Sequence, residues 1–245
     1  MSTDPRLLDH AALERSSVVA NTAMNRERGL SGVNSYARDL GLDPFASLAE
    51  RLPAPVRWID VCCGSGRALL EAEARFAAEY PEAEVALLGI DLVGYFQGAP
   101  RTPRLRLVTA SAHEWRPDGD ADLVTCVHGL HYIGDKLALL TAMAGWLTPG
   151  GTLAAHFDPA GIRHRDGSSA ARPVLAELRR AGVGYDSRRH LVTTRGPATL
   201  RFSASYLGAD DTAGPGYTGQ PAVTSHYGGD YSSIYSNSLD SMIPR

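Results

Sequence analysis

The stretch WIDVCCGSGRA, residues 58–68, decides the fold of this chain. It starts as an apolar run typical of a buried strand, passes through two glycines one residue apart, and ends where a helical pattern begins. Gly64 and Gly66 allow a tight turn and let the backbone approach a ligand closely. Taken alone, such a turn is compatible with a nicotinamide site, a flavin site or a turn that binds nothing.

Apolar and helical runs alternate around this stretch and after it. The expected strands cover residues 56–62, 84–91, 104–111, 121–128 and 152–157, and the expected helices cover residues 67–79, 135–146 and 173–181. Near-continuous apolar strands separated by helices indicate a parallel sheet covered on both faces. Two later alternating runs, residues 190–194 and 200–207, predict an antiparallel pair with each other. We therefore expect a doubly wound α/β fold with a mostly parallel seven-stranded sheet and a terminal antiparallel strand pair.

The chain divides by composition into three zones. Residues 1–53 predict a helical N-terminal cap, residues 54–211 hold the Rossmann-like alternation, and residues 212–245 form a tail rich in Gly, Ser and Tyr. The composition of the tail is typical of disorder, whereas its tyrosines are unusual for a passive linker. A disordered tail, a lid over a site and an arm of a homodimer are the interpretations that remain open.

The composition argues against several classes of protein. Of the 245 residues 44% are hydrophobic, and the formal net charge of -3 argues against a nucleic-acid partner, since such domains usually carry a basic face. No apolar run approaches the ~20 residues that span a bilayer, and the charged N-terminus does not resemble a signal peptide. We expect no membrane association and a cytoplasmic location. The cysteines lack a zinc spacing, so no metal site is predicted.

The residues that follow each strand are the candidates for a binding site, because ligands of open parallel sheets bind at the carboxyl ends of the strands. Leu69 stands where a dinucleotide fingerprint has its third glycine, and a carboxylate at Asp60 would repel a pyrophosphate. The same carboxylate suits the ammonium group of S-adenosylmethionine. Asp91 ends the second strand, where its oxygens suit the two hydroxyls of a ribose; a nicotinamide site shares this feature, so it does not discriminate between the two cofactors. The site is therefore predicted to bind S-adenosylmethionine rather than a dinucleotide.

These motifs closely resemble those of the class I methyltransferase family over roughly residues 55–211. The resemblance rests on five segments that occur in the family's order, namely residues 60–66, 91, 111–115, 122–132 and 147–153. It implies a small-molecule enzyme with S-adenosylmethionine as its cofactor. The cofactor-binding residues that it implies are Asp60, Cys62, Gly64, Ser65, Gly66, Asp91, Leu92, Ala112, His113 and Cys126.

The sequence departs from the family's pattern in two places. Ser111 stands where an acid usually precedes the alanine, so an acidic contact to the adenine amino group is lost or moves to Glu114. Residues 93–100 contain two glycines and a proline, and they predict a loop where the family usually has a helix. In that loop, Tyr95 or Phe96 either stacks near the adenine or is an ordinary buried aromatic.

Three histidines at predicted strand ends, His128, His131 and His156, are the candidate catalytic residues. Methyl transfer requires alignment of the reacting groups and exclusion of water. An oxygen or nitrogen acceptor can also need a base, which a histidine supplies at neutral pH. The alternative for each histidine is a structural hydrogen bond or a pocket wall. In the cap, Tyr36 is a candidate contact to the methionine carboxylate, with helix packing as the alternative; Arg28 or Arg38 would pair with that carboxylate.

The expected function is methyl transfer from S-adenosylmethionine to a small organic or natural-product acceptor, with the accepting atom left open. Two alternatives share the fold: a non-methylating adenosylmethionine-binding enzyme such as a cyclase, and a non-catalytic module that activates a partner. A nicotinamide dehydrogenase is a more remote alternative, because the turn after the first strand is compatible with it.

Overall fold

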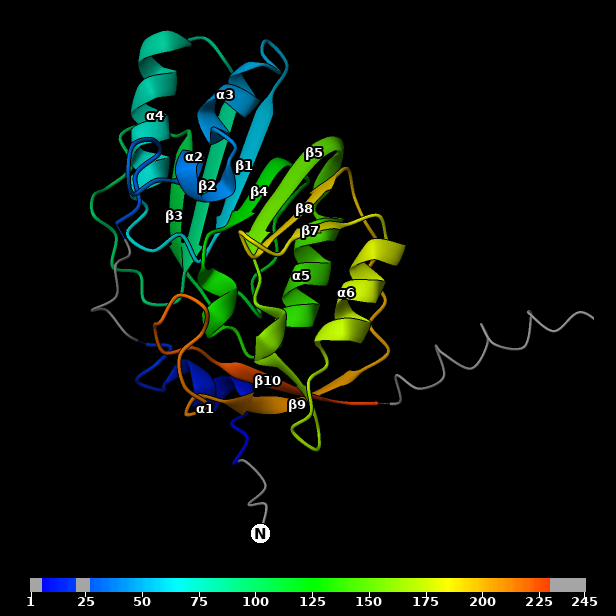
Figure 1. Cartoon of the computed structure of the whole chain (residues 1–245). Coiled ribbons are helices and arrows are strands. Elements are labelled where there is room, and N and C mark those ends of the chain that lie inside the picture. The colour runs from blue at the N-terminus through cyan, green and yellow to red at the C-terminus, as the bar shows by residue number, and fades with distance from the viewer. Residues whose placement is uncertain (1–5, 21–26, 230–245) are drawn as a thin grey trace, which may run out of the picture.

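A seven-stranded sheet forms the centre of the computed structural model, which describes residues 6–20 and 27–229 (Figure 1). Its strand order is β3-β2-β1-β4-β5-β8-β7. The strands are β1 (Val56–Val61), β2 (Val85–Asp91), β3 (Leu105–Thr109), β4 (Ala121–Cys126), β5 (Leu147–His156), β7 (Gly184–Asp186) and β8 (Leu191–Arg195). The first five are parallel, and β8 is antiparallel to both β5 and β7. The predicted doubly wound fold is confirmed.

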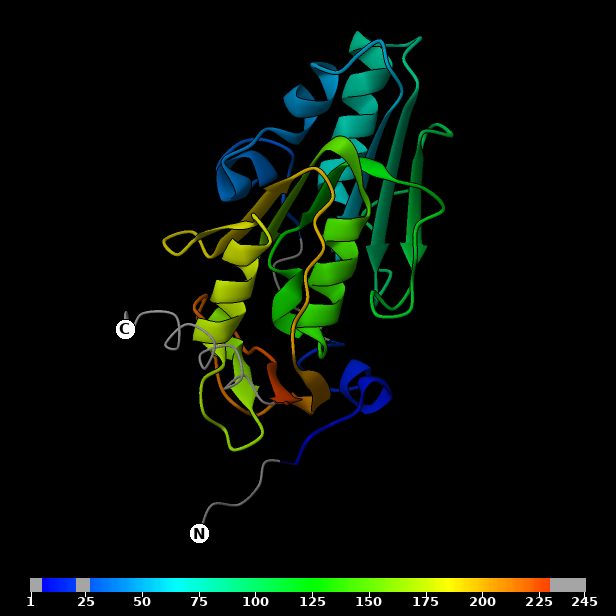
Figure 2. The same cartoon turned by 90° about the vertical axis from the view of Figure 1, so that its right-hand side faces the viewer.

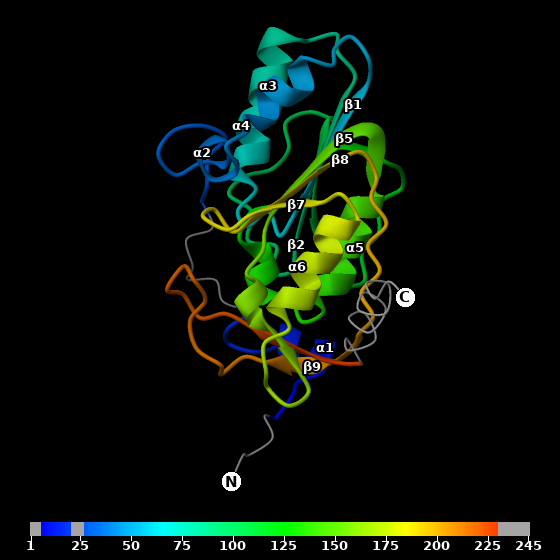
Figure 3. The ribbon, with the colours of Figure 1, turned by 45° about the vertical axis from the view of Figure 1, so that its right-hand side comes forward.

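Helices cover both faces of this sheet. On one face, α2 (Tyr36–Leu40), α3 (Pro44–Ala49) and α4 (Arg67–Glu79) share one apolar core with β1 and β2. On the other face, α5 (Lys136–Gly145) and α6 (Ala171–Arg180) lie side by side over a second core (Figures 1 and 3). The helix α4 forms where expected because Leu69, Ala72 and Phe76 recur on one face and are buried against the sheet.

A second, smaller sheet lies at the carboxyl end of the parallel strands. It consists of β6 (Ile162–His164), β9 (Ser205–Asp210) and β10 (Thr224–Gly228), with β10 in the middle. The short helix α1 (His10–Glu14) adjoins it, since Leu8 pairs with Ala209. In Figure 2 the arrowheads of the central strands point toward this layer. The 3-10 helices η1 (Gly129–Tyr132) and η2 (Pro159–Gly161) follow β4 and β5 at the same end.

The antiparallel pair at the end of the central sheet differs in its members from the predicted pair. The prediction that residues 190–194 pair with residues 200–207 is wrong, because β8 pairs with β5 and β7, whereas β9 pairs with β10. The strand β7 was missed because its three residues, GYD, carry no apolar alternation. A short turn connects β7 to β8. Because strands that are close in sequence pair readily, β7 occupies the edge of β8 that was expected to pair with residues 200–207.

Two other predictions concern segments around the core. Residues 93–100 form no helix, as predicted from their glycines and proline. Tyr95 is 68% exposed, while Phe96 packs against the core that contains α4. Of the tail, residues 224–228 form β10, and residues 230–245, with Tyr231 and Tyr235, lie outside the described residues. The three-zone division of the chain and the function of the tail stay predictions. No helix in the described part of the chain is long and apolar enough to cross a bilayer.

Candidate active site

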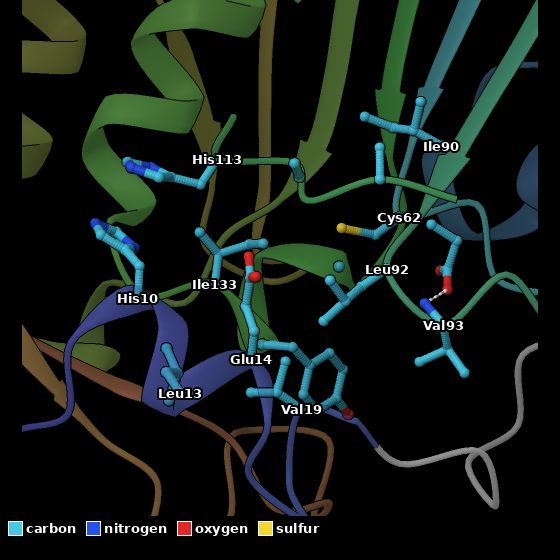
Figure 4. Close-up of a pocket in the computed structure, with 16 residues that line it drawn as sticks. His10, Leu13, Glu14, Val19, Cys62, Ile90, Leu92, Val93, His113 and Ile133 are labelled. Atoms are coloured by element: carbon cyan, nitrogen blue, oxygen red, sulfur yellow. Dashed lines mark hydrogen bonds between the residues drawn. The ribbon is translucent and has the colours of Figure 1, made fainter. Parts of the chain in front are cut away.

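A cavity opens at the carboxyl ends of β1, β2 and β3 (Figure 4). Its walls are largely apolar and come from α1, the end of β2, the segment after β3 and the segment around η1. The apolar side chains include Leu13, Val19, Ile90, Leu92, Ala112 and Ile133, and the polar ones include His10, Glu14, Asp91 and His113.

Asp91 holds the turn after β1 against the end of β2. Its Oδ2 accepts a hydrogen bond from the backbone N–H of Gly64 at 3.0 Å, and its Oδ1 accepts one from the N–H of Val93 at 3.0 Å. These bonds orient the carboxylate at the edge of the cavity. The turn itself needs glycine at Gly66, whose φ of 72° favours a residue without a side chain.

Asp60 lies within β1 and is the centre of a buried hydrogen-bonded chain. Its Oδ2 accepts from the hydroxyl of Tyr36 at 2.7 Å and its Oδ1 accepts from the hydroxyl of Thr125 at 2.6 Å. The indole N–H of Trp58 donates to Thr125 at 2.8 Å. Burial raises the pKa of Asp60 to about 7, despite these hydrogen bonds, and the charge of Asp91 adds to the rise. The carboxyl is therefore poised to change its charge near neutral pH.

The helix η1 packs tightly on the turn after β1. A side chain added at Gly129 would bring its Cβ within 2.9 Å of the sulfur of Cys62 and 2.8 Å of that of Cys126. Cys62 lines the cavity and Cys126 is buried behind it. A hydrogen bond with Cys126, together with burial, raises the pKa of the Cys62 thiol well above its usual value, so this thiol is a neutral wall of the cavity.

Around η1, four histidines and a tyrosine form a group that we call the histidine cluster: His128, His131, His156, His190 and Tyr217. The rings of His128 and His156 stack with their centroids 4.0 Å apart, and those of His128 and His131 lie 5.9 Å apart. Tyr217 stacks on His190 at 3.8 Å and meets His131 edge-on at 5.0 Å. The structure thus brings together the three histidines predicted from the sequence. It adds His190, which precedes β8, and Tyr217, which comes from the loop between β9 and β10.

The buried histidines of the cluster are neutral. Burial, together with the neighbouring His128, lowers the pKa of His131 and of His156 to about 3. The Nε2 of His131 and the Nδ1 of His156 are buried and have no hydrogen-bond partner among the described residues. Buried polar atoms without partners are rare in proteins, so these two ring nitrogens are available to a ligand.

His128 is held between two partners. Its Nε2 lies 3.5 Å from Oδ2 of Asp39, and its Nδ1 lies 3.1 Å from the hydroxyl of Tyr217. Although burial acts to raise it, hydrogen bonds from His128 and Arg28 hold the pKa of Asp39 below its usual value. An ionised carboxylate can only accept, so Nε2 carries the proton and Nδ1 accepts from the tyrosine.

Backbone strain marks the same region. In the described part of the chain, the non-glycine residues with positive φ are Cys62 and His128, both at 58°, and His190 at 52°. Such a conformation costs of order 1–3 kcal/mol and persists where the surroundings enforce it, often at functional sites. One of the three lines the cavity and two belong to the histidine cluster. No group of three or more His, Cys, Asp or Glu among the described residues is arranged to hold a metal ion.

The sequence model of the methyltransferase domain matches residues 33–166, which is more than half of the chain. The chain belongs to the methyltransferase domain family. This match bears out the assignment made from the sequence, and with it S-adenosylmethionine as the cofactor.

Two relatives of this methyltransferase domain match it over about 110 residues each. A trans-aconitate 2-methyltransferase from Methylobacterium radiotolerans is 36% identical over 113 residues, 45% of this chain and 42% of that protein. A ubiquinone biosynthesis O-methyltransferase from Xanthomonas campestris is 34% identical over 110 residues, 43% of this chain and 45% of that protein. The chain spans a little under half the length of these curated relatives. An adenosylmethionine-bound amino pentose methyltransferase from Micromonospora echinaspora is 28% identical, with 49% of this chain and 52% of that one covered and a TM-score of 0.33.

The cavity of this methyltransferase domain suits S-adenosylmethionine. Its apolar walls fit a flat base, and Asp91 offers carboxylate oxygens to the hydroxyls of a ribose. Of the residues predicted to bind the cofactor, Cys62, Asp91, Leu92, Ala112 and His113 line the cavity. Gly64, Ser65 and Gly66 form the turn that follows β1, while Tyr36, Asp60 and Cys126 are buried behind it. The cofactor contact of each residue stays a prediction.

Some residues of the site were not among those predicted from the sequence of this domain. His190 and Tyr217 come from segments interpreted as a strand and a tail, and Asp39 and Glu14 come from the N-terminal zone. Arg28, interpreted as a partner of the methionine carboxylate, donates its Nε–H to Asp39 at 2.7 Å, and Arg38 donates to the carbonyl of Val33 at 3.0 Å. The clustered tyrosines of the tail were the one clue, and Tyr217 is among them.

Proposed function

We propose that this chain transfers the methyl group of S-adenosylmethionine to a small organic acceptor that binds against the histidine cluster. The observation that carries the proposal is the position of η1 between the two parts of the site. Gly129 and Tyr132 line the cofactor cavity, whereas His131, from the same helix, belongs to the cluster. Residues of one short helix therefore face both the cofactor cavity and the histidine cluster, so the two adjoin and can form one site.

Methyl transfer needs little covalent chemistry from the protein. The bound cofactor supplies a methyl group that its sulfonium activates, and the chain has to align the acceptor and exclude water. The two unpartnered ring nitrogens of His131 and His156 offer hydrogen bonds to an acceptor without adding charge. Tyr217, on the loop between β9 and β10, closes the cluster from the outside.

A proton on the accepting atom has a path away from it. The Nδ1 of His128 faces the hydroxyl of Tyr217, and Asp39 lies on the opposite side of the same ring. Asp39 orients the imidazole and stabilises the cation that forms when His128 takes up a proton. This chain of groups favours an acceptor with an O–H or N–H that is deprotonated as it is methylated.

The chemical class of the acceptor is inferred from the site and from the relatives. Burial keeps the rings of His131 and His156 neutral, and the net charge of -3 does not favour nucleic acid. Relatives are named for trans-aconitate and for ubiquinone biosynthesis, which are small organic compounds. We therefore propose a small acceptor, natural-product precursors included.

The test is product analysis with a panel of tricarboxylic acids, phenols and amino sugars. Mass spectrometry follows both S-adenosylhomocysteine and the methylated acceptor. We expect both to form with at least one acceptor, His128→Ala to lower kcat at least 100-fold, and Tyr217→Phe to lower it about tenfold. His164→Ala, which lies outside the cavity and the cluster, serves as the matched control and should retain the wild-type rate.

The alternatives give different results in the same experiment. Consumption of an acceptor without S-adenosylhomocysteine would indicate a non-methylating enzyme such as a cyclase. Cofactor binding without turnover of any acceptor, unaltered by His128→Ala, would indicate a non-catalytic module. Either result would overturn the proposal.

A further inference from the structure

We propose that Glu14, on the N-terminal helix α1, recognises the adenine amino group of the cofactor. The inference rests on the proposed function, because it assumes that S-adenosylmethionine occupies the cavity. The end of β3, where the class I family usually has an acid, carries Ser111 in this chain. The structure supplies a carboxylate at that position from a segment 97 residues earlier in the chain.

The first observation is the position of the Glu14 side chain. It lines the cavity, and Figure 4 shows it pointing from α1 into the cavity. The hydroxyl of Ser111 donates to its Oε1 at 2.5 Å, which fixes the orientation of the carboxylate. No donor among the described residues reaches Oε2, so this oxygen is available to a ligand.

The second observation is the shape of the cavity around Glu14. The ring of His10 stacks on that of His113 at 3.6 Å with an angle of 15° and closes the cavity on the side of α1. Apolar side chains, among them Leu13 and Ile133, form the walls, and they suit a flat base. Asp91, from the end of β2, supplies a second carboxylate to the same cavity. A ligand that spans these groups carries donors at both ends, as an aminated nucleoside does.

The chemistry of a carboxylate selects the base. An ionised carboxylate accepts hydrogen bonds and donates none, so Glu14 favours a base with an exocyclic amine. Hypoxanthine has a carbonyl oxygen in place of the amine of adenine, and two acceptors facing each other repel. The site is therefore selective for adenine over hypoxanthine through one side chain.

The neighbouring acid Glu114 does not fill this position. It is exposed in the turn after β3 and does not line the cavity. The sequence left two possibilities for the acidic contact to the adenine amino group: the contact is absent, or Glu114 makes it. The structure indicates a third, in which α1 supplies the carboxylate.

The experiment compares two ligands by isothermal titration calorimetry, S-adenosylhomocysteine and its hypoxanthine analogue S-inosylhomocysteine. The wild-type chain should bind the adenine ligand at least tenfold more tightly, since hydrogen bonds to charged groups have effects of this size. Glu14→Gln should remove most of this preference, because an amide can donate to the hypoxanthine oxygen. Glu114→Gln is the matched control and should keep the wild-type ratio.

A second variant keeps the test decisive if Glu14→Gln folds poorly. The double variant Glu14→Ala, Ser111→Asp returns the acid to the end of β3 and should restore the preference for adenine, while Glu14→Ala alone should not. An unchanged ratio in Glu14→Gln, or no restoration by Ser111→Asp, would overturn the inference. A wild-type chain that binds neither ligand would instead overturn the proposed function.

Discussion

The substitution Asp60→Asn tests whether a carboxyl that is buried without a cation controls the pH dependence of stability. Burial raises the pKa of Asp60 to about 7, from an ordinary value of 3.8. The folded state therefore binds a proton that the unfolded state releases between these two values. The contribution of this bound proton to the free energy of unfolding is fully present below pH 3.8 and is lost as the pH rises through 7.

The magnitude follows from the pKa. Between pH 5 and pH 7 the folded chain retains a proton that the unfolded chain has lost, and each pH unit corresponds to about 1.36 kcal/mol. The free energy of unfolding of the wild type should therefore fall by about 2–3 kcal/mol between pH 5 and pH 8 because of this group. His131 and His156, whose pKa values burial lowers to about 3, act in the opposite direction, but they are present in both proteins. The difference between wild type and Asp60→Asn isolates the carboxyl.

Urea unfolding of both proteins at pH 5, 6, 7 and 8 measures this difference. The free energy of unfolding of the wild type minus that of Asp60→Asn should fall by about 2–3 kcal/mol across this pH range, and the m-value should not change. Asp120→Asn, at an exposed position, should show a difference that does not vary with pH. A flat difference for Asp60→Asn, or one that grows with pH, would show that the carboxyl is ionised throughout and that the reasoning is wrong.

Three further predictions address the walls of the site. Gly129→Ala should lower the free energy of unfolding by about 1–3 kcal/mol and weaken S-adenosylhomocysteine binding in calorimetry, because the added methyl group meets two cysteine side chains. Gly145→Ala is the control: it has open space around it and should stabilise α5. Thr125→Val should lower the free energy of urea unfolding by about 2–3 kcal/mol, since it removes a donor to a buried carboxylate. Thr193→Val, exposed on β8, should change it by less than about 0.5 kcal/mol. The ring protons of His156, whose pKa burial lowers to about 3, should not shift in NMR spectra between pH 5 and 8, and a midpoint near 6.5 would contradict the burial.

The sequence predicted the central sheet well because its strands carry their own signal. The runs ending at Asp60–Val61 and at Asp91 are apolar and buried on both faces, so composition alone identifies them. The second sheet was not predicted, because the strands β6 (IRH) and β10 (TSHYG) are short and polar. Their pairing depends on contacts between distant segments, which a local pattern does not contain.

The candidate site was predictable to the extent that it follows from the strands. His128 and His156 lie at or just beyond strand ends, so topology alone places them near each other. Tyr217 and Glu14 reach the site from the two ends of the chain, and no spacing rule connects them to it. Asp60 was predicted to accept from the cofactor's ammonium group, directly or through water, and that contact stays a prediction; the hydroxyl groups of Tyr36 and Thr125 are its partners in the structure.

The central position of β10 in the second sheet has a consequence for the order in which the molecule is completed during synthesis. All strands of the large sheet lie before residue 196, so that sheet can form while the remaining residues are still being made. The small sheet cannot close until residues 224–228 emerge, because β10 separates β6 from β9. The layer over the strand ends is therefore the last part to assemble, and Tyr217, on the loop between β9 and β10, joins the histidine cluster only at that stage.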